Sequence, residues 1–288
     1  MAVDGVEMHI DRGDIYGFVG ENGSGKTTVI RLITGLIAPF SGSFTLFGTE
    51  STDSEIGKAR SRIGAIVESP SIYLNMSAYD NLKQQCILRG QDESRILPTL
   101  TDVGLEDLYN DKKAAGNFSL GMRQRLGIAM VLLGDPEFII LDEPMNGLDP
   151  AGIVEIRELI LRLNRRGITF LISSHILTEL SLVATKYGII SKGRLIKEIT
   201  SEQLREECLK TTTLNSDDPA ALAGCLREVF PDYQMKDTAT GVKILGDIDL
   251  NAVLLSAIER GIKLTSVNCN QASFEEYYLS LVGGKHRE

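Results

Sequence analysis

The chain has 288 residues, of which 43% are hydrophobic and 24% charged, and its net charge is −9. These values are typical of a globular protein with one or two domains, and the acidic balance argues against nucleic acid as the main partner. The four scattered cysteines indicate free thiols in a reducing compartment, and no segment reaches the ~20 apolar residues that a membrane-spanning helix needs, so we expect a cytoplasmic protein.

The first 19 residues are rich in short apolar pieces. Residues 1–6 and 8–10 read as two strands, and Arg12-Gly13-Asp14 reads as a turn. We therefore predict a hairpin at the start of the chain. The apolar run at 15–19 then predicts a buried strand.

A glycine-rich stretch follows this strand and matches the phosphate-binding pattern G-x-x-x-x-G-K-[ST]. It reads Gly20-Glu21-Asn22-Gly23-Ser24-Gly25-Lys26-Thr27, and Thr28 opens the helix behind it. Its glycines let successive backbone N–H groups converge on a polyanion, and the helix adds its positive N-terminal end. An ordinary glycine turn is the alternative, but the order of strand, loop and helix favours a nucleotide site. We expect all nine residues to bind nucleotide, with Lys26 at the β- and γ-phosphates and Thr27 on Mg²⁺.

The next hundred residues change from strands to helices. Gly35 is expected to stop the first helix, and residues 43–48 alternate as a half-buried strand. Residues 63–67 predict a short buried strand that ends at Glu68, and residues 77–133 read as mainly helical. A helix begins near Ser119, a good N-cap, and Gly121 permits close backbone approach, so this helix start is a candidate phosphate contact.

A second strand–helix–strand unit occupies the region after Pro136. Residues 138–141 and 168–172 predict buried parallel strands, with an amphipathic helix over 151–166 between them. Asp142 ends the first strand and is expected to hold Mg²⁺, while the adjacent Glu143 is placed to act as a general base. A pair of surface acids would be the simpler explanation, but the P-loop argues against it. His175 ends the second strand, and we predict that it contacts the γ-phosphate.

The last third of the chain changes character near residue 200. Residues 187–199 predict a hairpin, and residues 201–210 read as a polar linker helix. The order strand, helix, two strands, helix, strand over 211–268 predicts a small ferredoxin-like unit, followed by a final helix at 273–281. We therefore expect two domains, a nucleotide-binding domain over 1–200 and an accessory α+β domain over 201–288.

The order of these motifs resembles the ATP-binding subunits of ABC transporters over about residues 1–200. The resemblance implies an α/β P-loop cassette with a mostly parallel sheet, an antiparallel β subdomain and a helical subdomain. It also implies that Asn146-Gly147-Leu148-Asp149 is the D-loop and His175 the switch histidine. Glu68 stands where that family has a glutamine, so it is a candidate catalytic and Mg²⁺-binding residue. In this family two cassettes sandwich two ATP molecules, so Ser119 and Gly121 of one copy are expected to contact the γ-phosphate held by Lys26 of the other.

Three departures refine this resemblance. The signature, normally Leu-Ser-Gly-Gly-Gln, is here Phe118-Ser119-Leu120-Gly121-Met122. Glu68 and residues 200–288 are similar to the bacitracin-resistance and lantibiotic-immunity branch. Relatives also carry a first strand and an adenine-stacking aromatic residue before the segment equivalent to Ala2, whereas here no aromatic residue precedes Tyr16, which is expected to be buried. Either the start lies too far downstream or the nucleotide binds without stacking, and we favour the first explanation.

The resemblance implies an ATPase that drives a separate membrane permease for export of a peptide antibiotic. Such a subunit would lie on the inner face of the cell membrane as a homodimer of cassettes, with no nucleic-acid partner. The alternative is a soluble ABC ATPase acting on nucleic acid or the ribosome, which the single cassette and acidic charge disfavour. A GTP-binding switch is disfavoured because the guanine-reading motif Asn-Lys-x-Asp is absent.

Overall fold

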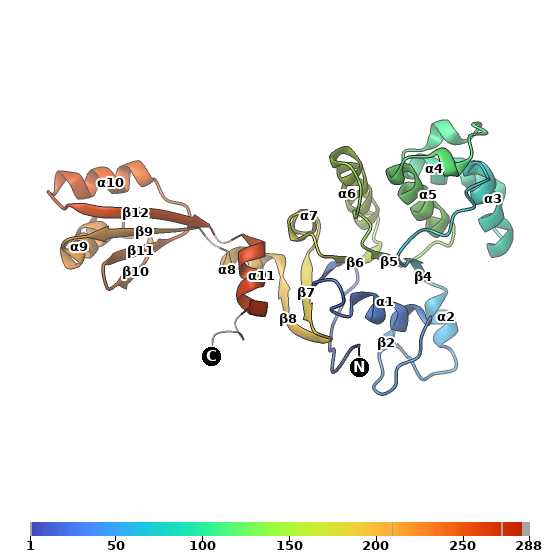
Figure 1. Cartoon of the computed structure of the whole chain (residues 1–288), viewed down its shortest axis with the longest axis horizontal. Helices are drawn as coiled ribbons and strands as arrows, with labels where there is room; N and C mark the ends of the chain where they lie inside the picture. The colour runs from blue at the N-terminus through green and yellow to red at the C-terminus, as the bar shows by residue number, and fades with distance from the viewer. Residues whose placement is uncertain (1, 209, 272, 284–288) are drawn as a thin grey trace. The chain divides into compact units, whose positions relative to one another are not determined.

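The computed structural model describes residues 2–208, 210–271 and 273–283, coloured along the chain in Figure 1. The chain divides into two compact units, Met1–Ser201 and Glu202–Glu288. Each unit has its own sheet, and each is described by itself below.

The first unit is built on a six-stranded sheet with the order β4-β5-β6-β1-β7-β8. Neighbouring strands are parallel except for the hairpin β7–β8, so the expected mostly parallel α/β sheet is confirmed. A small hairpin, β2–β3, lies apart from it. The strands are β1 Ile15–Val19, β2 Thr45–Leu46, β3 Thr49–Glu50, β4 Ile63–Ile66, β5 Phe138–Asp142, β6 Thr169–Ser174, β7 Lys186–Ser191 and β8 Arg194–Thr200.

Several helices of this unit begin or end at signals that the sequence carries. Ser77, Ser119 and Asp149 each accept a backbone N–H at a helix start, and Gly35 ends α1 in the left-handed conformation. Helices α3, α4 and α5 pack against one another, which gives the expected helical part. The α-helices are α1 Lys26–Thr34, α2 Ile56–Arg60, α3 Ala78–Arg89, α4 Ile96–Asp102, α5 Leu120–Leu132, α6 Pro150–Arg165 and α7 Leu177–Ser181.

One core cluster of the first unit lies between the sheet and the helix that follows β1. Tyr16, Phe18, Ile30, Ile140 and Leu171 are all 0% exposed and belong to one cluster. Burial of such side chains stabilises a fold by roughly 1.5–3 kcal/mol each. The prediction that Tyr16 is buried in its strand is therefore confirmed, and this core fixes the strand ends that carry the polar residues.

Two expectations about the early part of the chain are wrong. Residues 2–13 form no strand, because their backbone groups bond elsewhere: Asp4 N donates to Gly193 O at 2.8 Å and His9 N to Oε1 of Glu198 at 2.8 Å. Their apolar side chains still pack against the core, which explains the strand-like alternation. The strand expected at 43–48 is likewise interrupted, because Phe47 and Gly48 adopt positive φ angles of 50° and 83° and turn the chain between β2 and β3.

The second unit contains a four-stranded antiparallel sheet with the order β10-β11-β9-β12. Helices α9 and α10 pack against each other, and Leu214, Leu222, Val242 and Val253 share the core with them. The element order from β9 to β12 is strand, helix, two strands, helix, strand. The elements are α8 Ser201–Glu207, β9 Lys210–Ser216, α9 Pro219–Val229, β10 Gln234–Thr238, β11 Gly241–Leu245, α10 Leu250–Glu259, β12 Leu264–Gln271 and α11 Phe274–Gly283.

Candidate active site

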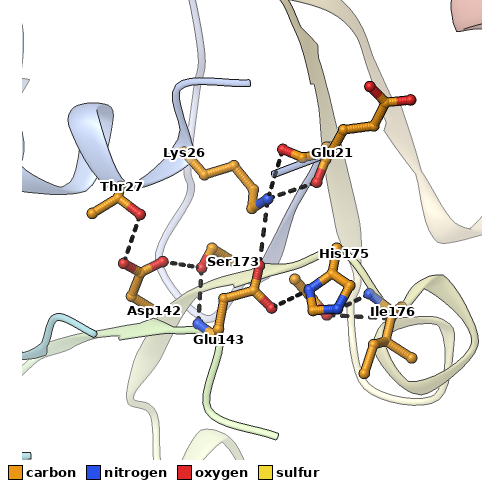
Figure 2. A network of polar contacts seen from close by, with 10 residues as sticks. Glu21, Lys26, Thr27, Asp142, Glu143, Ser173, His175 and Ile176 are labelled. Carbon is orange, nitrogen blue, oxygen red and sulfur yellow. Dashed lines mark hydrogen bonds and ion pairs between the residues drawn. The ribbon is translucent and has the colours of Figure 1, made fainter. Parts of the chain in front are cut away.

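The polar residues singled out by the sequence gather at one edge of the six-stranded sheet. The glycine-rich loop follows β1, Asp142 ends β5, and His175 follows β6. These three strands are neighbours and parallel, so their carboxyl ends meet at the same edge. Figure 2 shows the resulting network, in which Lys26, Thr27, Asp142, Glu143 and His175 lie within one set of contacts.

The glycine-rich loop has the backbone that its sequence requires. Gly23 and Gly25 adopt φ angles of 80° and 110°, and Gly25 is the N-cap of α1. A Cβ on Gly20 would lie 2.4 Å from Ile190 O, so only glycine fits there. Oγ of Ser24 is buried and has no hydrogen-bond partner among the described residues. Because buried polar atoms are normally paired, this orphaned hydroxyl fits a loop that receives a polar ligand.

The side chain of Lys26 is buried and folds toward its own loop. Its Nζ donates to Gly20 O at 2.6 Å and to Glu21 O at 3.2 Å, and it lies 3.4 Å from Oε1 of Glu143. That carboxylate oxygen is buried and makes no hydrogen bond in the described part of the chain. The ammonium group therefore bridges the loop and the acid at the end of β5, where a phosphate oxygen would compete for it. Glu21, Asn22 and Gly23 are exposed, and Thr28 lies in the first turn of α1.

Asp142 is held between two hydroxyl groups. Thr27 donates to Oδ2 at 2.9 Å from α1, and Ser173 donates to Oδ1 at 2.5 Å from β6. Among the described residues there is no group of three or more His, Cys, Asp or Glu side chains that could hold a metal by themselves. Mg²⁺ is typically bound by one or two carboxylates together with substrate phosphates. One carboxylate beside a threonine hydroxyl and a phosphate loop therefore fits that ion.

Glu143 and His175 form a close pair beside this carboxylate. Nδ1 of His175 lies 2.7 Å from Oε2 of Glu143. The φ angle of Glu143 is 52°, a conformation that costs a non-glycine residue roughly 1–3 kcal/mol. Its N–H is fixed by Ser173, whose Oγ accepts at 2.9 Å and whose backbone O lies at 3.2 Å. The strained backbone therefore directs the Glu143 side chain toward both Lys26 and His175.

The role of Ser173 was missed by the sequence analysis. Its hydroxyl donates to Asp142 and accepts from the N–H of Glu143, so it joins the two acids. The sheet register explains this role, because Ser173 is paired with Asp142 across β5 and β6. A serine at a strand end beside two acids would have indicated this contact only once the strand order was known.

Three predicted site residues lie outside this network in the single chain. The Glu68 carboxylate forms an ion pair with Arg31 of α1. Ser119 caps α5 by accepting from Met122 N at 3.2 Å, and Gly121 lies in the first turn of that helix. In the described part of the chain, no contact joins any of the three to Lys26 or Asp142.

Comparison with known proteins identifies the family of this arrangement. The sequence profile described as ABC transporter matches residues 3–146. The chain is 39% identical to the bacitracin transport ATP-binding protein BcrA of Bacillus licheniformis, over 98% of this chain and 93% of that protein. The chain belongs to the ABC transporter family. It is also 45% identical to the lantibiotic transport ATP-binding protein SrtF of Streptococcus pyogenes, over 68% of this chain and 83% of that protein.

The solved structures agree with this assignment. CbiO1 of Clostridium perfringens, part of the ABC transporter complex cbiONQ, superimposes with a TM-score of 0.64 at 26% identity, over 80% of this chain and 89% of that one. The prediction of an ABC cassette that binds and hydrolyses ATP as a transporter subunit is therefore confirmed. Neither curated relative acts on nucleic acid or the ribosome by its name, so the alternative function gains no support.

Proposed function

We propose that this ABC ATPase powers the export of a peptide antibiotic through a separate membrane permease. The support comes from the two antibiotic-transport relatives, one of which aligns with almost the whole chain, including the second unit. The described residues contain no helix long and apolar enough to cross a membrane. In this proposal the permease would provide the export path and would hold this subunit at the cytoplasmic face.

The observation that carries the hydrolytic part of the proposal is the contact chain from Lys26 through Glu143 to His175. Lys26 and the loop N–H groups would bind the β- and γ-phosphates of ATP. The carboxylate of Glu143 would accept a proton from the attacking water, a role that contributes ~10²–10⁴-fold in rate. His175 would hold Glu143 in place and contact the γ-phosphate.

Thr27 and Asp142 are the residues that would hold Mg²⁺, with Glu68 as a further candidate. The ion would neutralise charge on the phosphates. The protein's own contribution is the orientation of the Asp142 carboxylate, which Ser173 and Thr27 fix from both sides. These two contacts would position Asp142 for the metal, and the neighbouring Glu143 would remain available to the attacking water.

We further propose that two copies of the chain assemble around two ATP molecules. Ser119 and Gly121 lie at the N-terminal end of α5, a 13-residue helix whose dipole favours an anion. Among the residues that the structure describes, this end makes no contact with the Lys26 network, and a second copy would complete it. Residues 201–288 would form an accessory domain of ferredoxin-like topology.

We propose that the permease contacts this subunit beside a cavity of about 370 Å³. Its walls come from the end of α1, the loop after β4, and helices α3 and α5. Leu36, Ile87 and Leu88 are exposed apolar side chains at the end of α1 and on α3, and apolar exposure near a cavity is typical of a protein contact.

A resistance assay tests this proposed function. The chain would be expressed together with a permease encoded beside its gene, in a host sensitive to bacitracin and lantibiotics. The dose of each antibiotic that inhibits growth would then be measured. Resistance should appear with the wild-type pair and vanish with Lys26→Ala, whereas Lys58→Ala, an exposed lysine on α2, should keep it. Equal sensitivity of wild type and Lys26→Ala to both antibiotic classes would overturn the proposed substrate class.

A further inference from the structure

Helix α1 reaches two neighbouring strand ends with two residues on one face. Thr27 and Arg31 are four residues apart, so their side chains lie one above the other on the helix. Thr27 contacts Asp142 at the end of β5, and Arg31 contacts Glu68 just beyond β4. The helix therefore holds one acid with a neutral hydroxyl and the other with a cation.

Glu68 lies at the same edge of the sheet as the metal-binding candidates. Strands β4 and β5 are parallel, and Ile66 is paired with Leu141. Glu68 is two residues past Ile66, just as Glu143 is two residues past Leu141. The φ angle of Glu68 is 64°, so the chain turns sharply at this residue.

The ion pair between Arg31 and Glu68 is weak enough to be replaced by a contact with another cation. The side chains are 43% and 64% exposed, and such pairs are weak in water. A carboxylate next to Mg²⁺ and phosphates has a competing partner of higher charge. In a single position, the Glu68 carboxylate cannot contact both Arg31 and the metal ion.

We propose that Arg31 is a positioning residue that competes with the metal ion for the Glu68 carboxylate. The proposal rests on the proposed function of this site and adds a regulator to it. In the contact described above, Arg31 holds Glu68 on the side of helix α1. When nucleotide and metal bind, the Glu68 carboxylate would leave Arg31 and contact the metal ion, and the Arg31 side chain would be released.

This exchange has a direct route to the cavity described above. Val67 and Ser69, the two neighbours of Glu68, both line that cavity, as does Thr34, one turn beyond Arg31 on α1. A change of partner at Glu68 therefore alters the cavity wall. The change of partner at Glu68 would thus link the state of the nucleotide site to the permease proposed to contact this cavity.

The experiment measures metal binding in the presence of the nonhydrolysable analogue AMP-PNP, with Mn²⁺ as the probe and electron paramagnetic resonance as the readout. Removal of the competitor in Arg31→Gln should lower the half-saturating Mn²⁺ concentration by up to about fivefold, the ratio that a weak ion pair allows. Arg31→Lys should restore most of the wild-type value. Glu68→Gln should raise the midpoint, and adding Arg31→Gln to it should have no further effect.

Arg227→Gln is the matched control. Arg227 pairs with Asp237 at 2.7 Å, and the two side chains are 53% and 58% exposed, similar to the Arg31 pair. This variant should leave the midpoint unchanged. An equal effect of Arg31→Gln with and without Glu68, or no effect at all, would overturn the proposal while leaving the proposed function intact. Failure of the wild-type chain to bind AMP-PNP and Mn²⁺ would overturn both.

Discussion

Oε2 of Glu143 lies 2.7 Å from Nδ1 of His175, although 32 residues separate them in the sequence. The contact exists because β5 and β6 are parallel neighbours and each places one of these residues at its carboxyl end. His175 thus holds one oxygen of the carboxylate while the other faces Lys26. Each residue of this pair therefore limits where the other can point.

The first prediction concerns this carboxylate. Glu143→Gln should reduce steady-state ATP hydrolysis by ~10²–10⁴-fold, because the amide cannot accept the proton of the attacking water. ATP binding should persist, since Lys26 and the loop N–H groups are untouched. The variant should accumulate as an ATP-bound dimer in size-exclusion chromatography. Glu259→Gln, an exposed residue of α10, is the control, and near wild-type turnover by Glu143→Gln would show that the base is another group.

The second prediction concerns the serine that joins the two acids. Ser173→Ala removes a hydroxyl that donates to Asp142 and accepts from Glu143 N. Leaving a buried polar group short of a partner costs ~1–3 kcal/mol, and Asp142 keeps its second partner, Thr27. Chemical denaturation should therefore show a loss of stability of that size, and kcat should fall.

Ser174→Ala is the matched control for this change. In the described part of the chain, the hydroxyl of Ser174 bonds only within its own turn, to the N–H and carbonyl of Ile176 at 2.9 and 3.3 Å. It should lower kcat much less than Ser173→Ala. Equal kcat values for the two variants would contradict the role assigned to Ser173.

The third prediction concerns stability at high pH. Burial, and then the hydrogen bond to Glu198 at 2.7 Å, raise the pKa of Tyr16 far above its usual value of 10.0. The folded state therefore keeps Tyr16 neutral while the unfolded chain ionises it, so its contribution is complete below pH 10 and is lost as the pH rises further. Each pH unit above 10 should cost the wild type about 1.4 kcal/mol more than Tyr16→Phe.

Urea unfolding at pH 8 and at pH 11 measures this difference. In Tyr16→Phe, Glu198 still accepts from His9 N and lies 3.7 Å from Nζ of Lys186, so we expect the variant to fold. Tyr233→Phe, a partly exposed tyrosine of the second unit, is the control. If the wild type and Tyr16→Phe lose the same unfolding free energy between pH 8 and pH 11, the pKa of Tyr16 is not raised in the folded state.

Much of the site was predictable because its residues follow local rules. The P-loop pattern places Lys26 and Thr27 at a helix start, and a buried strand followed by two acids places Asp142 and Glu143 at a sheet edge. Ser173 was missed because its contact depends on the register of two strands that are far apart in the sequence. No local pattern carries that register.

The errors in the fold have a similar cause. Val3 and Val6 alternate as in a strand and do pack against the core, but Asp4 and His9 give their N–H groups to a turn carbonyl and a side chain. Side-chain periodicity reports which residues are buried, whereas strand pairing depends on a partner backbone. The pairing of Glu68 with Arg31 was equally hidden, because it joins a helix to a distant strand end.

The last prediction concerns the base of the nucleotide. Beside the P-loop lie Ala2 and Val3: a Cβ on Gly25 would be 3.0 Å from Ala2 O and 3.1 Å from Cγ2 of Val3. Tyr16 is 0% exposed and cannot stack on a ligand. Stacking a base on an aromatic ring is worth ~1–3 kcal/mol in nucleic-acid sites, so a chain that binds the base without such a ring should hold the nucleotide mainly through its phosphates. ATP and GTP should therefore compete almost equally for this chain in a displacement titration with a fluorescent nucleotide, with CTP as a smaller-base control. A tenfold or greater preference for ATP would show that other residues of the chain read the adenine.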